Sequence, residues 1–485
     1  MLVRHTSQYM VSSAVNAALG FASAAVFTRL LTPADYGIYV VGFSTANFIA
    51  ATIFTWVRYS VMRFEAEGGA VDVRMTSLAG YVVSAATTPI LLLLIHFVFH
   101  APWERAGFAI AVALGMSLFD LGQEILRSRL NVWAFIVGSV LRSAVAFVVC
   151  IGIAELGGGG LGQLGGAALA YFASSAFSAR SIWRGPRAPI DRDKLKLFLK
   201  LGASVTLAGF LVAFQSSLDR LFIAWRFGDV EAGLYGAAAD VVKQIILIPA
   251  GSVAAAAFPL TVRAFARGDA DHTQRQLERT GELLFAVLAP AAVGMALTAP
   301  YLDSFLLGPA FRATAATIMP ILAFAWLFQS ISQTYIHVSF HLAMRQDLAI
   351  PHGLAALAAN AALLWPSTSF FGPAGAAWSL LASEIIGAAA GYALTWKAHR
   401  LPTVFKPGRR IVFACAAMAL CVYALERHMS DYSAAGFVML AITGALVYAT
   451  IAVVMNICDA RAFVLNAAQL GLARCTPKRS AAGRV

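Results

Sequence analysis

Long apolar runs separated by short polar segments dominate this sequence. A helix that crosses a bilayer needs about 20 mostly apolar residues, and fourteen runs of roughly that length follow one another along the chain. They lie at about 9–28, 37–57, 77–99, 107–126, 132–153, 161–182, 197–222, 232–259, 281–299, 313–340, 351–371, 373–396, 411–425 and 433–456. The pattern predicts an all-α integral membrane protein with about fourteen transmembrane helices, of which the thirteenth is the shortest.

A short motif occurs twice in this pattern. Residues 35–39 read DYGIY and residues 231–235 read EAGLY, and each copy precedes or begins an apolar run. Two weaker matches follow in the same order, 63–68 with 263–268 and 166–168 with 375–377. An internal repeat of this size in a hydrophobic chain is typical of transporters built from two related lobes.

The longest polar connection, 183–196, separates six apolar runs from eight. Six crossings return the chain to its starting side, so the two lobes are expected to be parallel repeats. We therefore predict a six-helix lobe in 1–182, a basic cytoplasmic linker in 183–196, a second six-helix lobe in 197–400, two additional helices in 401–458 and a basic cytoplasmic tail in 459–485.

Composition supports a membrane location and sets the orientation. Of 485 residues, 60% are hydrophobic and 12% charged, too few charges to cover a soluble surface. With a cytoplasmic N-terminus, 28 of the 36 Lys and Arg residues fall in cytoplasmic segments and 6 on the other side. The positive-inside rule thus places both termini in the cytoplasm, and it explains the net charge of +12 without nucleic-acid binding.

Metal and catalytic chemistry have little support in the sequence. The five cysteines form no CxxC pair and are interpreted as apolar packing residues. His337 and His341 have the spacing of two metal ligands, but no HExxH glutamate accompanies them. No polar loop is long enough for a catalytic module, so we expect a protein that is not an enzyme and has no catalytic residues, metal or cofactor.

Three segments carry a family resemblance. Residues 27–39 (FTRLLTPADYGIY) resemble the opening of bacterial polysaccharide biosynthesis proteins, the lipid-linked oligosaccharide flippases of the multidrug/oligosaccharidyl-lipid/polysaccharide exporter superfamily. Residues 306–311 (LLGPAF) and 371–377 (FGPAGAA) resemble the family's loops before its tenth and twelfth helices. The resemblance covers nearly the whole chain.

This resemblance implies a V of two six-helix bundles around a central cavity, plus two extra C-terminal helices. Such a protein works by alternating access in the bacterial inner membrane. The implied cargo is an oligosaccharide on a polyprenyl diphosphate, destined for exopolysaccharide, capsule or O-antigen. Membrane lipids would surround the protein, and a polysaccharide polymerase and glycosyltransferases would be its pathway partners. The alternatives are an ion-coupled multidrug or organic cation exporter of the same superfamily, and a membrane polysaccharide polymerase or ligase.

Charged residues inside apolar runs are the candidate site residues, because charge within a membrane is functional by default. Arg142 and Lys243 lie deep in their runs and could bind a diphosphate. The structural alternative for Lys243 is an ion pair with Asp240, three residues earlier on the same helix face. Arg142 could instead pair with a carboxylate on a neighbouring helix.

Four further residues complete the candidate set. Arg58 and Arg220 lie near the ends of their runs, as charges on the cavity rim or as interfacial anchors. Asp240 and Glu384 are candidate coupling carboxylates, because a buried carboxyl group can protonate during a transport cycle. Glu124 and Arg127 have the spacing of a local ion pair. Arg142 and Lys243 together favour an anionic cargo.

Overall fold

The structure is a computed structural model that describes residues 2–64, 72–99, 101–185, 188–402, 405–429 and 432–462. Its regular elements are helices, and each of the fourteen predicted runs falls on one or more of them. Within the described residues, ten helical segments are long and apolar enough to cross a membrane. The predicted all-α membrane fold is confirmed. Of the predicted tail in 459–485, the part after residue 462 lies outside the described residues.

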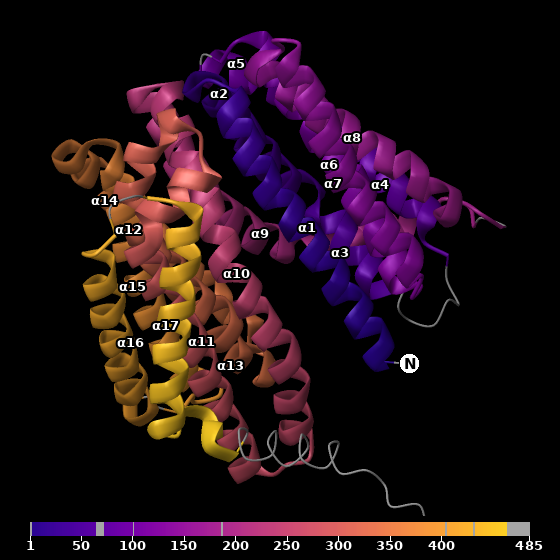
Figure 1. Ribbon diagram of the computed structural model, residues 1–485. Helices are drawn as coiled ribbons and strands as arrows, with labels where there is room; N and C mark the ends of the chain where they lie inside the picture. The colour runs from indigo at the N-terminus through magenta and orange to yellow at the C-terminus, as the bar shows by residue number, and fades with distance from the viewer. Residues whose placement is uncertain are drawn as a thin grey trace, which may run out of the picture.

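The N-terminal half is a bundle of helices that stand side by side (Figure 1). Thr32 caps the second helix by accepting a hydrogen bond from the Asp35 backbone N–H, and Pro33 occupies its first position. A π-helical turn, η1, interrupts that helix before it continues as α3. The elements are α1 (Leu2–Leu30), α2 (Pro33–Ile49), η1 (Ala50–Phe54), α3 (Thr55–Phe64), α4 (Arg74–Ala85), α5 (Thr88–Phe99), α6 (Trp103–Ser128), α7 (Val132–Glu155) and α8 (Gly159–Ile182).

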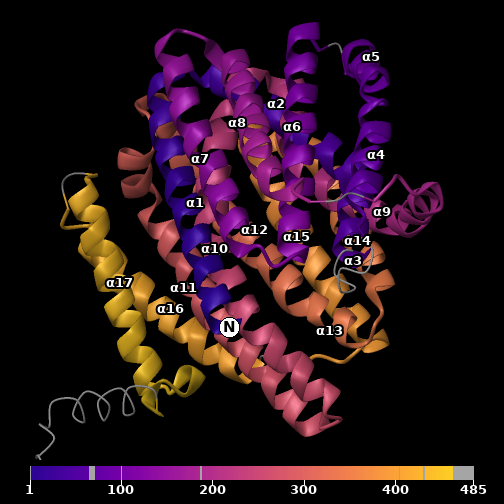
Figure 2. The same ribbon diagram turned by 90° about the vertical axis from the view of Figure 1, so that its right-hand side faces the viewer.

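The C-terminal half is a second bundle. Its elements are α9 (Arg192–Phe227), α10 (Asp229–Ala266), α11 (Ala270–Leu306), η2 (Pro309–Phe311), α12 (Arg312–Ile331), η3 (Ser332–Ile336), α13 (His337–Leu342), η4 (Gln346–Leu348), α14 (Ala349–Phe371), η5 (Gly372–Ala374), α15 (Gly375–Leu394) and η6 (Thr395–Lys397). The last two long helices, α16 (Phe405–Glu426) and α17 (Ala434–Val454), pack together against α11 on the outside of this bundle (Figure 2).

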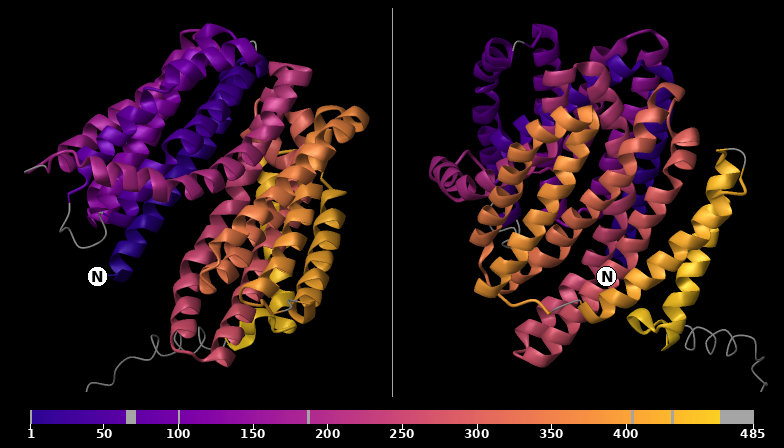
Figure 3. Two further views of the ribbon diagram at one scale, coloured as in Figure 1. Left: turned by 180° about the vertical axis from the view of Figure 1, so that it is seen from behind. Right: turned by 90° about the vertical axis from the view of Figure 1, so that its left-hand side faces the viewer.

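The two halves meet at one end and diverge at the other (Figures 1 and 3). We call these the closed end, where α2 and α10 begin, and the open end. At the closed end α2 packs along α10, and Arg105 of α6 forms an ion pair of 2.7 Å with Asp229 of α10. The two halves thus form a V (Figures 1 and 3).

The repeated motif lies at this closed end, where its two copies contact each other. A Cβ atom on Gly37 would lie 1.8 Å from the carbonyl oxygen of Asp229, and one on Gly233 would lie 2.1 Å from that of Pro33. No side chain fits in either place, so the glycine shared by the two copies is required by the contact between the halves.

Helix α9 connects the halves (Figure 3). It begins at Arg192, inside the predicted linker 183–196, because Asp191 caps it by accepting hydrogen bonds from the backbone N–H groups of Asp193 and Lys194. The non-helical linker is therefore shorter than predicted. The helix packs on α3 and η1 of the first half and on α10 and α14 of the second.

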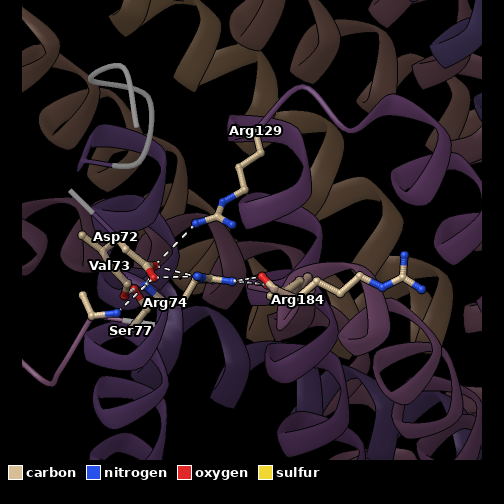
Figure 4. A network of polar contacts seen from close by, with 8 residues as sticks. Asp72, Val73, Arg74, Ser77, Arg129 and Arg184 are labelled. Carbon is tan, nitrogen blue, oxygen red and sulfur yellow. Dashed lines mark hydrogen bonds and ion pairs between the residues drawn. The ribbon is translucent and has the colours of Figure 1, made fainter. Parts of the chain in front are cut away.

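A polar network fixes the linker to the open end of the N-terminal half (Figure 4). Arg74 donates to the carbonyl oxygens of Ile182 at 2.7 Å and Arg184 at 3.0 Å, and pairs with Asp72 at 2.7 Å. Arg129 lies 3.5 Å from the same carboxylate, which also accepts from the Ala188 N–H. Hydrogen bonds from Arg74 hold the pKa of Asp72 well below its ordinary value of 3.8.

Candidate functional site

A cavity of about 390 Å³ lies between the two halves. Both halves contribute polar side chains to it: Asn16 and Ser23 from α1, Tyr36 and Asn47 from α2, Arg142 and Ser143 from α7, Tyr171 from α8, Ser216 and Arg220 from α9, and Asp240, Lys243 and Gln244 from α10. Polar groups are costly inside a membrane protein unless they are satisfied or used. This cavity is therefore the candidate functional site.

Arg142 reaches the cavity without a carboxylate partner among the described residues. Its Nη2 donates to Ser143 Oγ at 2.8 Å, and that hydroxyl donates to Asn16 Oδ1 at 2.8 Å. The guanidinium lies 5.4 Å from the ring centre of Tyr171 and 5.8 Å from that of Phe119. A neutral hydroxyl and two aromatic faces thus hold the side chain in place, and no carboxylate among the described residues forms an ion pair with it.

Lys243 also lines the cavity. Its Nζ lies 5.0 Å from the ring centre of Trp326, and within the described chain no carboxylate is at ion-pair distance. The alternative pairing of Lys243 with Asp240 is wrong, because Asp240 pairs at 2.5 Å with Arg220 from the neighbouring helix. A spacing of three residues makes such a pair possible on one helix face. The Asp240 carboxylate is bonded instead to the Arg220 guanidinium of α9.

Arg220 is consequently a cavity residue rather than a rim residue. It lies inside α9, which continues to Phe227, and its side chain lines the cavity. Three cations and one carboxylate therefore line this space, a net charge of +2 over Arg142, Arg220, Lys243 and Asp240. An anion of two charges would balance the cavity.

Arg58 lines a second, smaller cavity of about 130 Å³ in the N-terminal half. It lies 3.3 Å from Asp120, and Asn47 lines both this cavity and the larger one. The π-helical turn η1 contributes Ala50 and Phe54 to the wall. Glu124 does not line this cavity; it forms the predicted local ion pair with Arg127, at 2.7 Å.

The two candidate coupling carboxylates lie in different places. Asp240 is in the main cavity, whereas Glu384 of α15 is buried among helices of the C-terminal half. The Glu384 carboxylate accepts hydrogen bonds from Gln215 at 2.8 Å and Gln329 at 3.1 Å. Two neutral amides stabilise the carboxylate without neutralising it.

The candidate set from the sequence left out the buried carboxylate of Asp219. Asp219 is 5% exposed and accepts hydrogen bonds from Asn360 at 2.9 Å and Tyr235 at 3.3 Å. Its position within the apolar run 197–222 was the available signal, and the adjacent Arg220 obscured it. Among the described residues, no group of three or more His, Cys, Asp or Glu side chains could hold a metal ion.

The fold is that of a multi-pass, all-helical membrane protein whose two bundles enclose a polar cavity. A family model described as "Polysaccharide biosynthesis protein" matches residues 26–316, more than half of the chain, so this protein belongs to that family. No curated protein matches the sequence.

Solved structures show the same fold at low identity. A structure of the lipid II flippase MurJ in an inward closed conformation has a TM-score of 0.69 at 16% identity, and the match covers 92% of this chain and 98% of that one. An inward-facing multidrug resistance transporter of the MATE family has a TM-score of 0.64 at 16% identity, covering 80% and 94%. An outward-facing MATE structure has a TM-score of 0.53 at 16% identity, covering 81% and 94%. This chain therefore has the fold of this transporter superfamily.

Proposed function

We propose that this protein is a flippase that moves a polyprenyl-diphosphate-linked oligosaccharide across the bacterial inner membrane by alternating access. The proposed product is a cell-surface polysaccharide such as exopolysaccharide, capsule or O-antigen. The observation that carries the proposal is the net charge of +2 in a cavity between two halves, with Arg142 and Lys243 unpaired among the described residues.

A diphosphate esterified at both ends carries two negative charges at neutral pH, which matches this cavity. Arg142, Lys243 and Arg220 would contact the phosphate oxygens by charge-assisted hydrogen bonds. The sugar hydroxyls would meet polar cavity residues such as Asn16, while the polyprenyl tail stays in the bilayer. Such a site avoids the cost of several kcal/mol that each unpaired polar group would incur in hydrocarbon.

Access to the cavity follows from the charge pattern of the connections. With both termini cytoplasmic, the open end faces the cytoplasm, where lipid-linked sugars are assembled. Arg58 would then lie on the cytoplasmic side of the main cavity, in a position to attract the anionic head group. In this scheme residues 1–182 and 197–400 are the two moving lobes.

The multidrug exporter remains the second candidate, because MATE transporters share the fold. A cavity for organic cations needs an uncompensated carboxylate, and Asp240, the carboxylate lining this cavity, is already paired with Arg220. The cavity therefore favours an anion. We assign ion coupling to Glu384, which lies outside the cavity and has neutral hydrogen-bond partners. A polymerase or ligase is disfavoured by the absence of a long polar loop in the sequence.

The direct test is export of the surface glycan in a strain whose chromosomal gene carries Arg142→Ala. We expect glycan export to be abolished while the variant inserts in the membrane at the normal level, because the cavity loses an unpaired cation. Arg279→Ala is the matched control, since its side chain is 74% exposed and far from the cavity lining. Normal glycan in the Arg142→Ala strain would contradict the assignment, and loss of resistance to organic cations instead would favour the exporter.

A further inference from the structure

Three histidines lie in series at the open end of the C-terminal half. His337 and His341 are one turn apart on α13, and His352 is on α14. The Nε2 atom of His337 lies 3.0 Å from Nδ1 of His352, a direct ring-to-ring hydrogen bond. His341 is exposed, His337 is half-buried and His352 is buried. The hydrogen-bonded pair His337–His352 thus runs from the half-buried side into the bundle. At the surface, His341 Nδ1 lies 3.2 Å from Gln346 Nε2, and no hydrogen bond joins His341 to His337 among the described residues.

The free nitrogen of the buried histidine points further inward. His352 Nε2 is buried and has no hydrogen-bond partner. It faces α15 at two glycines: a Cβ atom on Gly391 would lie 3.1 Å from it, and one on Gly387 3.9 Å. Glu384 precedes Gly387 by three residues, about 4.5 Å along the helix axis. The glycines let α14 pack closely on α15, since a Cβ atom on Gly387 would lie 2.8 Å from the Cβ atom of Ala356. An unpartnered buried nitrogen commonly binds an ordered water.

Several other ionisable groups lie on the elements around the pair, and η4, which packs on α13 and α14, carries the Arg345–Asp347 ion pair of 3.0 Å. His341 faces His337 from α13, and Glu384 is the nearby carboxyl on α15. Tyr335 of η3 lies near Tyr392 of α15 and Glu278 of α11, and the backbone of His399 bonds with Ser339 of α13. Within the described chain, no carboxylate bonds to His337 or His352. The π-helical turn η3 immediately precedes His337, and such turns are frequent at functional sites.

We propose that His341, His337 and His352 form a proton path between the open end and Glu384. The proposal rests on the proposed function, in which the open end is cytoplasmic and Glu384 is the coupling carboxylate. A proton arriving from the His341 side binds Nδ1 of His337, and the Nε2 proton of His337 passes to Nδ1 of His352. The Nε2 proton of His352 then passes to Glu384 through an ordered water bound at that nitrogen.

Each ring gains one proton and loses one in this step, so both stay neutral at its end. The hydrogen bond between the rings reverses direction, and the Glu384 carboxylate becomes a carboxylic acid. Return of a proton along the same atoms restores the first state. Since imidazoles pass protons by exchanging tautomers and conduct no metal cations, the path makes the proton, rather than sodium, the coupling ion.

The test variant is the double substitution His337→Gln with His352→Asn. The Gln Nε2 replaces the His337 Nε2 as donor, and the Asn Oδ1 replaces the His352 Nδ1 as acceptor, so the contact can survive while tautomer exchange is lost. Purified protein in lipid nanodiscs is subjected to a rapid drop in pH. The infrared carbonyl band of protonated Glu384, identified by its absence in Glu384→Gln, is then followed in time.

We expect the band to rise about tenfold more slowly in the double variant, with the same final amplitude and an unchanged melting temperature. The control His428→Asn, which changes an exposed histidine beyond α16, should match the wild type. Equal rates in variant and wild type would overturn the proposal. So would a reduced amplitude with a lower melting temperature, which indicates a structural role, or a wild type without a Glu384 band.

The measurement uses no cargo, so its outcome is independent of the glycan assignment. A slow double variant combined with normal glycan in the Arg142→Ala strain would contradict the proposed function and leave the proton path standing. Equal rates combined with lost glycan in that strain would do the reverse.

Discussion

Two arginines of this protein, Arg74 and Arg142, differ in whether their charge is paired. Arg74, whose side chain is 4% exposed, is bonded to a carboxylate and two carbonyl oxygens at the open end of the N-terminal half. Arg142, in the central cavity, has a hydroxyl and two aromatic faces around it and, among the described residues, no carboxylate. The charge of Arg74 is paired with Asp72, and its side chain holds the linker to α4. Within the described part of the chain, the charge of Arg142 stays unpaired. An unpaired charge inside a membrane protein lowers stability, so its presence indicates a role other than holding the fold together.

The largest expected effect is on the free energy of unfolding, which should fall when Arg74 is replaced but not when Arg142 is replaced. Arg74→Ala leaves Asp72 without its main partner and two carbonyl oxygens without a donor, so we expect a loss of about 3 kcal/mol in unfolding free energy. Arg142→Ala should leave stability unchanged or raise it, because it removes a cation that forms no ion pair with the described residues. Thermal unfolding of the purified variants in detergent measures both.

The matched control for this comparison is Asp193→Ala. That side chain is 94% exposed and pairs with Lys196 at 3.4 Å, so its loss should change stability by less than about 0.5 kcal/mol. If Arg142→Ala destabilises the protein as much as Arg74→Ala, the cavity arginine is a structural residue and the contrast fails.

A smaller effect is expected from the carboxylate inside the cavity. Asp240 neutralises Arg220, so Asp240→Asn should free a third cation and strengthen binding of inorganic diphosphate about tenfold, or about 1.4 kcal/mol. Isothermal titration calorimetry on the purified protein measures the change. The variant should also release the anion more slowly. Weaker binding would show that Asp240 positions Arg220 rather than competing with the anion for it.

The smallest effect concerns the pH dependence of the linker network. Since Arg74 lowers the folded-state pKa of Asp72, the ionised carboxylate stabilises the fold above its ordinary pKa of 3.8, and this contribution fades as the pH falls from there toward the folded-state pKa. Asp72→Asn should therefore cost about 1 kcal/mol at neutral pH. The difference in melting temperature from wild type should shrink below about pH 4, and a difference that stayed constant into acid would rule out the ionised carboxylate as the cause.

The sequence predicted single charges better than their partners. Arg142 and Lys243 were recognised because an apolar run makes any charge conspicuous, and both line the cavity. Arg220 was assigned to the rim because its run seemed to end there, whereas α9 continues to Phe227. The ion pair of Asp240 with Lys243 was predicted because sequence spacing identifies neighbours on one helix. It does not identify neighbours on the adjacent helix, such as Arg220.

Periodicity and length alone determined the all-helical membrane fold, because the bilayer imposes the same apolar length on every crossing helix. The repeated Gly37 and Gly233 motif indicated two related halves. Only the tertiary structure revealed that these glycines touch each other, that Asp240 belongs to Arg220, and that His337 bonds to His352 instead of pairing with His341. These contacts join helices far apart in the chain, and their packing distances are set by side-chain shapes that leave no periodic trace in the sequence.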